Sequence, residues 1–471
     1  MPRRYRVNAM LRPLSLALGA AVLALGASPA VMAKKKAAPP AEPPAWTTDA
    51  YASTYRPVAS APVLISGAMV LVGNGERLDG ADVLLQDGRI AAVGVGLTAP
   101  AGALRVDGSG KWVTPGIIDN HSHLGVYPSP GTQSHADGNE MVAPVTSQVW
   151  AEHSAWPQDP GFAAALAGGV TTLQLLPGSA NLVGGRGVTL KNVPSVDVQG
   201  MKFPGAPYGL KMACGENPKR VYGQKGGPMT RMGNVAGLRT AFIEAREYAR
   251  RRAGSEPGKR DLKLDTLAAA MAGEIQVHIH CYRADEIAVM LDLAREFGFT
   301  IASIHHGVEA YKLADRLAGE GVCASLWADW WGFKMEAFDG IQENLVMVDR
   351  PTNGCAIVHS DSPEGIQRLN QEAAKAMAAG RRAGIEVAPE RAIRWLTQNP
   401  ARSLGVLEQT GTLEAGKMGD VVLWNGNPFS SYALADKVWI DGALMYDRQD
   451  RSRQPVSDFL LGQSDSQGGT P

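Results

Sequence analysis

The strongest signal in this chain is the stretch Thr114-Pro115-Gly116-Ile117-Ile118-Asp119-Asn120-His121-Ser122-His123. Its apolar centre, bounded by proline and glycine, predicts a short buried strand that ends at two histidines. Residues at i and i+2 of a strand project from the same face, so both imidazoles can reach one ion. Because imidazole is a favoured ligand of zinc and similar divalent metals, the stretch predicts a metal site at a strand end.

The N-terminus has the organisation of a secretory signal peptide, which we place at residues 1–33. Four arginines precede an apolar stretch, Leu14 to Ala27, that is too short to span a membrane, and small residues up to Ala33 offer a cleavage site. Residues 34–58, which begin KKKAAPPAEPP, predict a flexible linker without a core of its own. We therefore expect an exported protein, periplasmic or secreted.

Charge and cysteine content narrow the class of protein. Lys+Arg and Asp+Glu are both 46, so no global charge favours nucleic acid or an anionic membrane as a partner. No later apolar segment is long enough for a transmembrane span. The four cysteines are too few for a disulfide framework in so long a chain, and they lie in apolar runs. We expect them to be buried free thiols.

The rest of the chain divides into a central α/β region between two β-rich pieces. Residues 59–114 and 409–449 show short alternating strands and glycine-rich turns. Between them, over residues 115–408, apolar strand candidates alternate with amphipathic helices, which indicates a parallel α/β sheet. An insertion at 217–273 contains a charged helix, and its glycine-rich start could form a lid; residues 450–471 are a polar tail.

The pattern PGxxDxHxH resembles the amidohydrolase superfamily, and most closely its secreted, imidazolonepropionase-like branch. The resemblance covers nearly all of the chain after the signal peptide. It implies a distorted TIM (β/α)8 barrel and a small β-sandwich domain formed by both ends of the mature chain. It also implies one or two divalent metal ions, with Zn2+ as the first expectation.

In such a barrel, residues at the C-terminal ends of the strands converge on one site. Any one histidine there is more simply explained as a packed core residue. Together with an acid after the last strand, the set favours metal ligands. The candidates at the strand ends are His121, His123, Glu216, His280, His306 and Asp361.

At three strand ends, two nearby residues could each be the metal ligand, and the resemblance favours one of them. The segment HCYRADEI resembles the family's fifth-strand ending, which selects His280 over the deeper His278. His305 and His306 should point to opposite sides of a strand, and HGVEAYK favours His306. The ending HSD places the acid at Asp361 and leaves His359 to support the ligands or contact the substrate.

The fourth strand leaves the metal bridge open. Many relatives use a carboxylated lysine as the bridge, which Lys211 could supply, and others use a glutamate, which Glu216 could supply. A glutamate acts as a hard anionic ligand without modification, so we favour Glu216 and keep Lys211 as the alternative. A buried paired lysine and a helix-capping acid are the non-functional explanations for these two residues.

A small-molecule substrate that carries a carboxylate is suggested by cations in two segments. Arg186 lies in the glycine-rich stretch NLVGGRGVTLKN, which we expect to be a loop at the mouth of the site. Lys219 and Arg220 follow the fourth strand. A solvated surface arginine is an equally good explanation of Arg186.

Metal chemistry then predicts the reaction. A bound ion would lower the pKa of a water molecule and generate hydroxide. Asp361 would act as general base and return the proton to the leaving nitrogen, and His280 could assist. The expected reaction is hydrolysis of an amide, a cyclic amide or a small peptide-like C–N bond. A deaminase or a lactone or ester hydrolase could use the same site, and a non-catalytic metal-binding exported protein is the alternative from another class; a homo-oligomer is compatible with all of these.

Overall fold

The computed structural model describes residues 51–454 apart from 130 and 331. The expected signal peptide, residues 34–50 of the expected linker and most of the polar tail lie outside the described residues. Within the described part of the chain, no helix has the length and hydropathy of a membrane span.

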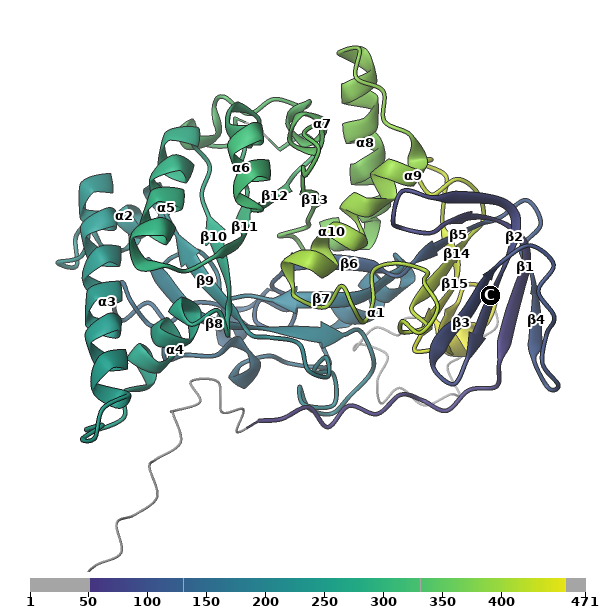
Figure 1. The fold of residues 1–471 in the computed structure, drawn as a ribbon, viewed down its shortest axis with the longest axis horizontal. Coiled ribbons are helices and arrows are strands. Elements are labelled where there is room, and N and C mark those ends of the chain that lie inside the picture. The colour runs from purple at the N-terminus through teal and green to yellow at the C-terminus, as the bar shows by residue number, and fades with distance from the viewer. Residues whose placement is uncertain (1–50, 130, 331, 455–471) are drawn as a thin grey trace, which may run out of the picture. The chain divides into compact units, whose positions relative to one another are not determined.

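The central sheet has eight strands whose spatial order follows the sequence. The pairing is parallel except at β8, which runs antiparallel to both of its neighbours. After β13, the backbone N–H of Asp361 donates to the carbonyl of His121 in β6 at 3.1 Å, so the two edges of the sheet approach each other. The expected distorted TIM-like barrel is therefore confirmed (Figure 1). The strands are β6 (Ile117–Ser122), β7 (Val170–Leu175), β8 (Val183–Lys191), β9 (Gly209–Ala213), β10 (Gln276–His280), β11 (Ile301–His305), β12 (Cys323–Leu326) and β13 (Ala356–Val358).

Helices follow the barrel strands and cover their outer faces. The strands are buried on both faces, which explains why they appear in the sequence as nearly continuous apolar runs. The helices outside the insertion are α1 (Pro160–Ala167), α5 (Ala284–Phe297), α6 (Ala314–Glu320), α7 (Asn344–Asp349), α8 (Leu369–Arg382), α9 (Pro389–Ala392) and α10 (Gln398–Ser403).

The predicted insertion, residues 217–273, contains most of three helices that connect β9 to β10. They are α2 (Glu216–Tyr222), α3 (Arg231–Arg252) and α4 (Leu262–Met271). The Asp261 carboxylate caps α4 by accepting from two backbone N–H groups of its first turn. The hydroxyl of Tyr248 in α3 donates to Asp265 in α4 at 2.7 Å, so the two helices pack together.

The two β-rich pieces meet in a second sheet, as expected. Strand β5 pairs antiparallel with β14, with Val113 opposite Leu423, and β1 connects β5 to the N-terminal strands. In Figure 1 the blue-to-purple N-terminal strands and the yellow C-terminal strands lie side by side. This sheet contains β1 (Val63–Leu71), β2 (Arg77–Gln86), β3 (Arg89–Gly94), β4 (Leu104–Asp107), β5 (Trp112–Pro115), β14 (Val421–Trp424), β15 (Ala435–Ile440) and β16 (Ala443–Asp447).

The last part of the linker, which the sequence predicted to be flexible and without a core of its own, is packed against the folded chain. Tyr55 is buried, and its hydroxyl donates to Asp441 at 2.5 Å. Ser53 donates to the carbonyl of Lys202 at 2.6 Å. The sequence suggested flexibility because alanine, proline and lysine dominate the segment, but one buried aromatic side chain is enough to dock its end.

The expectation of free thiols is wrong, because the four cysteines form two disulfides. Cys214–Cys281 joins the chain just after β9 to the chain just after β10, and Cys323–Cys355 joins the starts of β12 and β13. Neighbouring strands bring the Cα atoms of the pairs to 5.2 and 4.5 Å. Composition alone cannot show such pairing, because it depends on which strands are adjacent.

Candidate metal centre

The end of β6 places both histidines of the HxH motif at the mouth of the barrel. His123 Nδ1 lies 2.8 Å from the carbonyl oxygen of Leu176, which orients its ring, and the two Nε2 atoms are 3.3 Å apart. Asp119 accepts from the backbone N–H of His121 at 3.1 Å. Asp119 therefore orients the turn.

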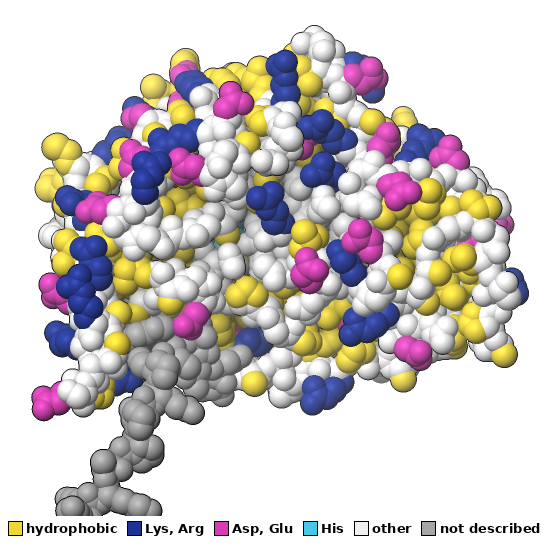
Figure 2. Space-filling view, in the orientation of Figure 1, with side chains coloured by type: hydrophobic (Ala, Val, Ile, Leu, Met, Phe, Trp, Pro, Cys, Tyr) yellow, Lys and Arg dark blue, Asp and Glu magenta, His cyan; other side chains and the backbone are white. Residues whose placement is uncertain are grey.

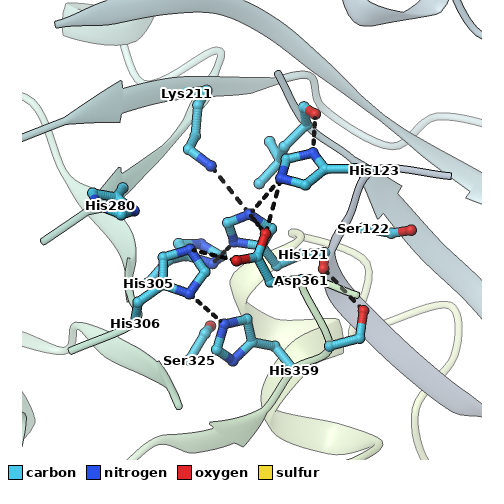
Figure 3. A network of polar contacts seen from close by, with 12 residues as sticks. His121, Ser122, His123, Lys211, His280, His305, His306, Ser325, His359 and Asp361 are labelled. Carbon is cyan, nitrogen blue, oxygen red and sulfur yellow. Dashed lines mark hydrogen bonds and ion pairs between the residues drawn. The ribbon is translucent and has the colours of Figure 1, made fainter. Parts of the chain in front are cut away.

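Asp361 connects the end of the last strand to these histidines. Its Oδ1 lies 3.0 Å from His123 Nε2 and 3.4 Å from His121 Nε2, and its Oδ2 lies 3.7 Å from His306 Nε2 (Figure 3). Asp361 and His306 both adopt left-handed backbone conformations, with φ of 51° and 60°. Such strain in non-glycine residues is typical of functional sites.

The unusual backbone at His306 also corrects the expectation that His305 and His306 point to opposite sides. The rings of both lie close to His121, at centroid distances of 4.7 and 4.5 Å. Both therefore face the interior of the barrel. Regular strand alternation fails here because His306 follows the last residue of β11 and turns the chain.

We call His121, His123, His306 and Asp361 the cluster. On the fourth strand, the structure brings Lys211 into contact with the cluster, whereas the favoured Glu216 lies elsewhere. Lys211 is buried, and its Nζ lies 3.1 Å from His121 Nε2. Glu216 begins α2, where it is partly exposed and its Oε1 lies 3.4 Å from Lys334 Nζ. Because β9 ends at Ala213, Glu216 starts the next helix and its side chain turns to a different partner.

His280 and His359 flank the cluster on two sides. His359 Nε2 lies 2.7 Å from His306 Nδ1, whereas His280 stands beside the network with its Nε2 3.3 Å from Asn217 Nδ2 (Figure 3). Three buried imidazole nitrogens have no hydrogen-bond partner among the described residues: His280 Nδ1, His306 Nε2 and His359 Nδ1. Unpaired buried nitrogens are costly and are expected where a ligand is to be bound.

The protonation of the cluster suits a cation. Burial is the largest cause that lowers the pKa of His121, His280 and His306 well below the usual value, so these imidazoles are neutral. Burial would raise the pKa of Asp361, but the hydrogen bond and charge of His123 and the charge of Lys211 hold it below its usual value. The site thus presents neutral nitrogen donors and an ionised carboxylate at neutral pH.

This donor set fits a divalent metal. Ligand atoms of His121, His123 and Asp361 all lie within 4.8 Å of one another, and so do those of His121, His306 and His359. Nitrogen and carboxylate oxygen donors are the ligands that zinc and similar ions take. The unpaired nitrogen of His306 described above supports the same conclusion.

Arg186 does not lie at the mouth of the site, which corrects the sequence prediction. It belongs to β8, is buried, and donates through Nε to Thr266 Oγ1 in α4 at 2.8 Å. Its guanidinium lies 4.3 Å from the ring centroid of Trp150. The glycine-rich stretch is a barrel strand, so its arginine supports the packing between strand and helix.

Other residues that the sequence did not single out line the site. Trp327 stacks on His306 at a centroid distance of 4.4 Å, and Trp330 stacks on Trp327 at 5.0 Å. Lys334 lies 4.5 Å from the ring centroid of Tyr282, and its charge is one cause of the lowered pKa of His280. The run of aromatic residues that follows β12 in the sequence could have indicated that this segment lines the site.

The two predicted cations on α2 have different surroundings. Arg220 is exposed, but its charge is among the causes that act on the pKa of the Tyr282 hydroxyl, so it lies near the site. Lys219 is only partly buried. Figure 2 shows positive and negative side chains interspersed over one face, which agrees with the balanced net charge.

Comparisons with known proteins agree with this arrangement. A profile of the amidohydrolase family matches residues 339–452. The structure of an amidohydrolase from Thermotoga maritima MSB8 is similar, with 35% identity and a TM-score of 0.75, and the match covers 82% of this chain and 100% of that one.

Two curated proteins are similar in sequence. The amidohydrolase tasK of Hapsidospora irregularis is 33% identical over 398 residues, which are 78% of this chain and 40% of that protein. An imidazolonepropionase of Mesorhizobium japonicum is 24% identical, over 73% of this chain and 86% of that protein. The chain thus spans less than half the length of the first of these relatives.

Proposed function

This chain belongs to the amidohydrolase superfamily, and from that membership we propose that it is a metal-dependent hydrolase of an amide, a cyclic amide or a small peptide-like C–N bond. The observation that carries the proposal is the convergence of three side chains. His121, His123 and Asp361 come from the two edges of the barrel sheet, yet their ligand atoms lie within 4.8 Å of one another. A purely structural cluster would not need an ionised carboxylate beside the neutral imidazole of His121.

The residues that would hold one or two metal ions, with zinc as the first candidate, are His121, His123, Lys211 in its carboxylated form, His280, His306 and Asp361. A bound ion of this kind supplies Lewis-acid chemistry: it lowers the pKa of a water ligand and polarises a carbonyl. Lys211 replaces Glu216 as the proposed bridge because its amine contacts His121.

Asp361 is the proposed general base. In the metal-free protein its carboxylate is ionised at neutral pH, since the neighbouring His123 and the unmodified Lys211 outweigh the effect of burial on its pKa. With Lys211 carboxylated, a bound cation would supply the positive charge that the lysine no longer carries. It accepts the proton of the attacking water and delivers it to the leaving nitrogen. Trp327 stacks on both His306 and His359, at centroid distances of 4.4 and 5.2 Å, and shields this side of the site from bulk water.

The walls of the site suggest which substrates fit. Trp330 and Phe333 leave 42% and 50% of their surface exposed beside the buried Trp327, so they offer an apolar surface to a substrate side chain. Lys334 and Arg220 supply positive charge near Tyr282. We therefore propose a small amide that carries an apolar group and a carboxylate.

Export to the periplasm or the cell exterior is part of the same proposal. The N-terminal pattern of arginines followed by an apolar stretch supports it. So do the two disulfides, because disulfides persist mainly in oxidising compartments.

The test is a panel of dipeptides, N-acyl amino acids, cyclic amides, lactones and aminopurines, assayed with the metal-loaded protein. We expect turnover of amides, with a lower KM for those that carry both an apolar side chain and a free carboxylate. The Asp361→Asn variant should lose about 100- to 10,000-fold in kcat while its folding is retained.

A matched control is Asp292→Asn, which changes an acid of α5 that pairs with Arg316 and lies outside the cluster. We expect its kcat to equal that of the wild type. Turnover of lactones or aminopurines alone would contradict the proposed reaction, and an Asp361→Asn enzyme with most of its kcat would contradict the role of Asp361.

A further inference from the structure

Beneath the candidate metal centre, three histidines and a glutamine form a row of contacts through the barrel core. His121 Nδ1 lies 2.8 Å from His305 Nδ1, and His305 Nε2 lies 2.9 Å from His278 Nδ1. His278 Nε2 in turn lies 3.2 Å from Gln174 Nε2. We call these four residues the imidazole row.

The barrel strands hold the imidazole row in place. His121, His305, His278 and Gln174 come from β6, β11, β10 and β7, and none is more than 1% exposed. An apolar core would fill this volume at a lower cost of desolvation. A buried polar row of this kind is stable only if each nitrogen faces a partner with the complementary role.

A neutral imidazole carries one proton, so the row has only two consistent proton orders. In the first, Gln174 donates to His278, His278 donates to His305, and His305 donates to His121 Nδ1. His121 would then carry its own proton on Nε2. That nitrogen faces His123, Lys211 and Asp361, and once protonated it has no lone pair for a metal.

In the second order, every proton is reversed. His121 Nδ1–H donates to His305, His305 Nε2–H donates to His278, and His278 Nε2–H donates to the amide oxygen of Gln174. This order leaves the lone pair of His121 Nε2 free to bind a metal. It also requires the side-chain amide of Gln174 to be turned round, because the structure places its nitrogen, not its oxygen, 3.2 Å from His278 Nε2. Once turned, the buried Oε1, which has no hydrogen-bond partner among the described residues, accepts from His278.

We propose that the imidazole row is a tautomer lock, in which His305, His278 and Gln174 act as positioning residues that hold His121 in the Nδ1–H form. The inference rests on the proposed function, because it takes His121 as a metal ligand. Metal-binding histidines generally donate their other N–H to an oriented acceptor. Here that acceptor is the imidazole of His305. Its tautomer is fixed through His278 by Gln174, at the end of the row.

The first test needs no substitution. The full chain, labelled with 15N-histidine and loaded with zinc, is studied by NMR, because the nitrogen shifts distinguish the two tautomers. We expect Nδ1–H at His121 and Nε2–H at His305 and His278. An Nε2–H tautomer at His121 in the zinc-loaded protein would overturn the inference.

The second test measures zinc affinity by competition with a chelator. His305→Phe removes the acceptor and should weaken zinc binding about 10- to 100-fold. His305→Asn offers an amide oxygen at the place of Nδ1 and should restore most of the affinity. Gln174→Glu, whose ionised carboxylate can only accept, should bind zinc at least as tightly as the wild type, whereas Gln174→Met should bind it more weakly.

The outcomes separate the two proposals. A wild-type protein that takes up neither zinc nor any other divalent ion would overturn the proposed function together with this inference. A wild-type protein that binds zinc, with unchanged affinity in His305→Phe and Gln174→Met, would overturn the tautomer lock alone.

Discussion

At the scale of single residues, Lys211 and Glu216 show where sequence reasoning reaches its limit. Lys211 lies within the apolar run of the fourth strand and Glu216 follows it, and either could have been the bridge. The structure distinguishes them because β9 ends at Ala213, so Lys211 points into the barrel while Glu216 begins α2. The exact end of a strand depends on packing with its neighbours, which the sequence alone does not specify.

Carboxylation of Lys211 by carbon dioxide should depend on pH. Its amine nitrogen would bond to the carbon of carbon dioxide and release a proton, which leaves a carbamate. Only the neutral amine reacts, and burial lowers the pKa of Lys211 from 10.5 to about 8, so reactivity is lost as the pH falls through about 8. At constant dissolved carbon dioxide, reconstitution of the metal-free protein with zinc should therefore speed up as the pH rises through this range.

Substitutions test the same residue. Lys211→Met should bind at most half of the metal of the wild type, and Lys211→Glu, which supplies a carboxylate directly, should recover part of it without bicarbonate. The measurements are metal content and the intact mass in native mass spectrometry. Full metal content in Lys211→Met would contradict the bridging role.

Arg186 should matter for stability and not for substrate binding. Arg186→Met removes a buried hydrogen bond to Thr266 and the contact with Trp150, and should lower the free energy of unfolding by about 3 kcal/mol. The KM for carboxylated substrates should be unchanged. Denaturant unfolding and steady-state kinetics on the same preparation check both statements. A raised KM with unchanged stability would show that Arg186 contacts the substrate.

At the scale of elements, the strands were predictable but their pairing was not. The mostly apolar runs that end at His280, His305 and Asp361 follow from the sequence, because strands buried on both faces do not alternate apolar and polar residues. Strand β8 was expected to be a loop, since glycines surround its arginine. Its antiparallel pairing with β7 and β9, like the two disulfides, depends on neighbours in space.

The disulfides provide the prediction at this scale. The Cys214→Ala/Cys281→Ala variant should lose about 2–4 kcal/mol of unfolding free energy, because the bridge closes a long loop in the unfolded chain. The bridges join residues separated by 67 and 32 positions, so loss of Cys323–Cys355 should cost about 0.7 kcal/mol less. Denaturant midpoints of the two double variants decide this; equal stability of the variants and the wild type would show that neither bridge forms.

At the scale of the whole molecule, the fold depends on contacts between distant parts of the sequence. The β domain joins β5 to β14, which lie about 300 residues apart, and the barrel edge joins Asp361 to His121. Such pairings could be expected only from the resemblance to a family, whereas the HxH motif and the acid after the last strand were visible in the residues themselves. Most residues of the site could thus be predicted from the sequence, but their arrangement in space could be predicted only in part.

The proposed function depends on metal binding where His121, His123 and Asp361 converge. The most direct measurement is elemental analysis of the full chain, purified without chelator, for zinc, manganese, iron, cobalt and nickel. We predict about two equivalents of metal per chain, as expected for a bridged pair of ions. Absence of metal, even after reconstitution with bicarbonate and each ion, would contradict the account.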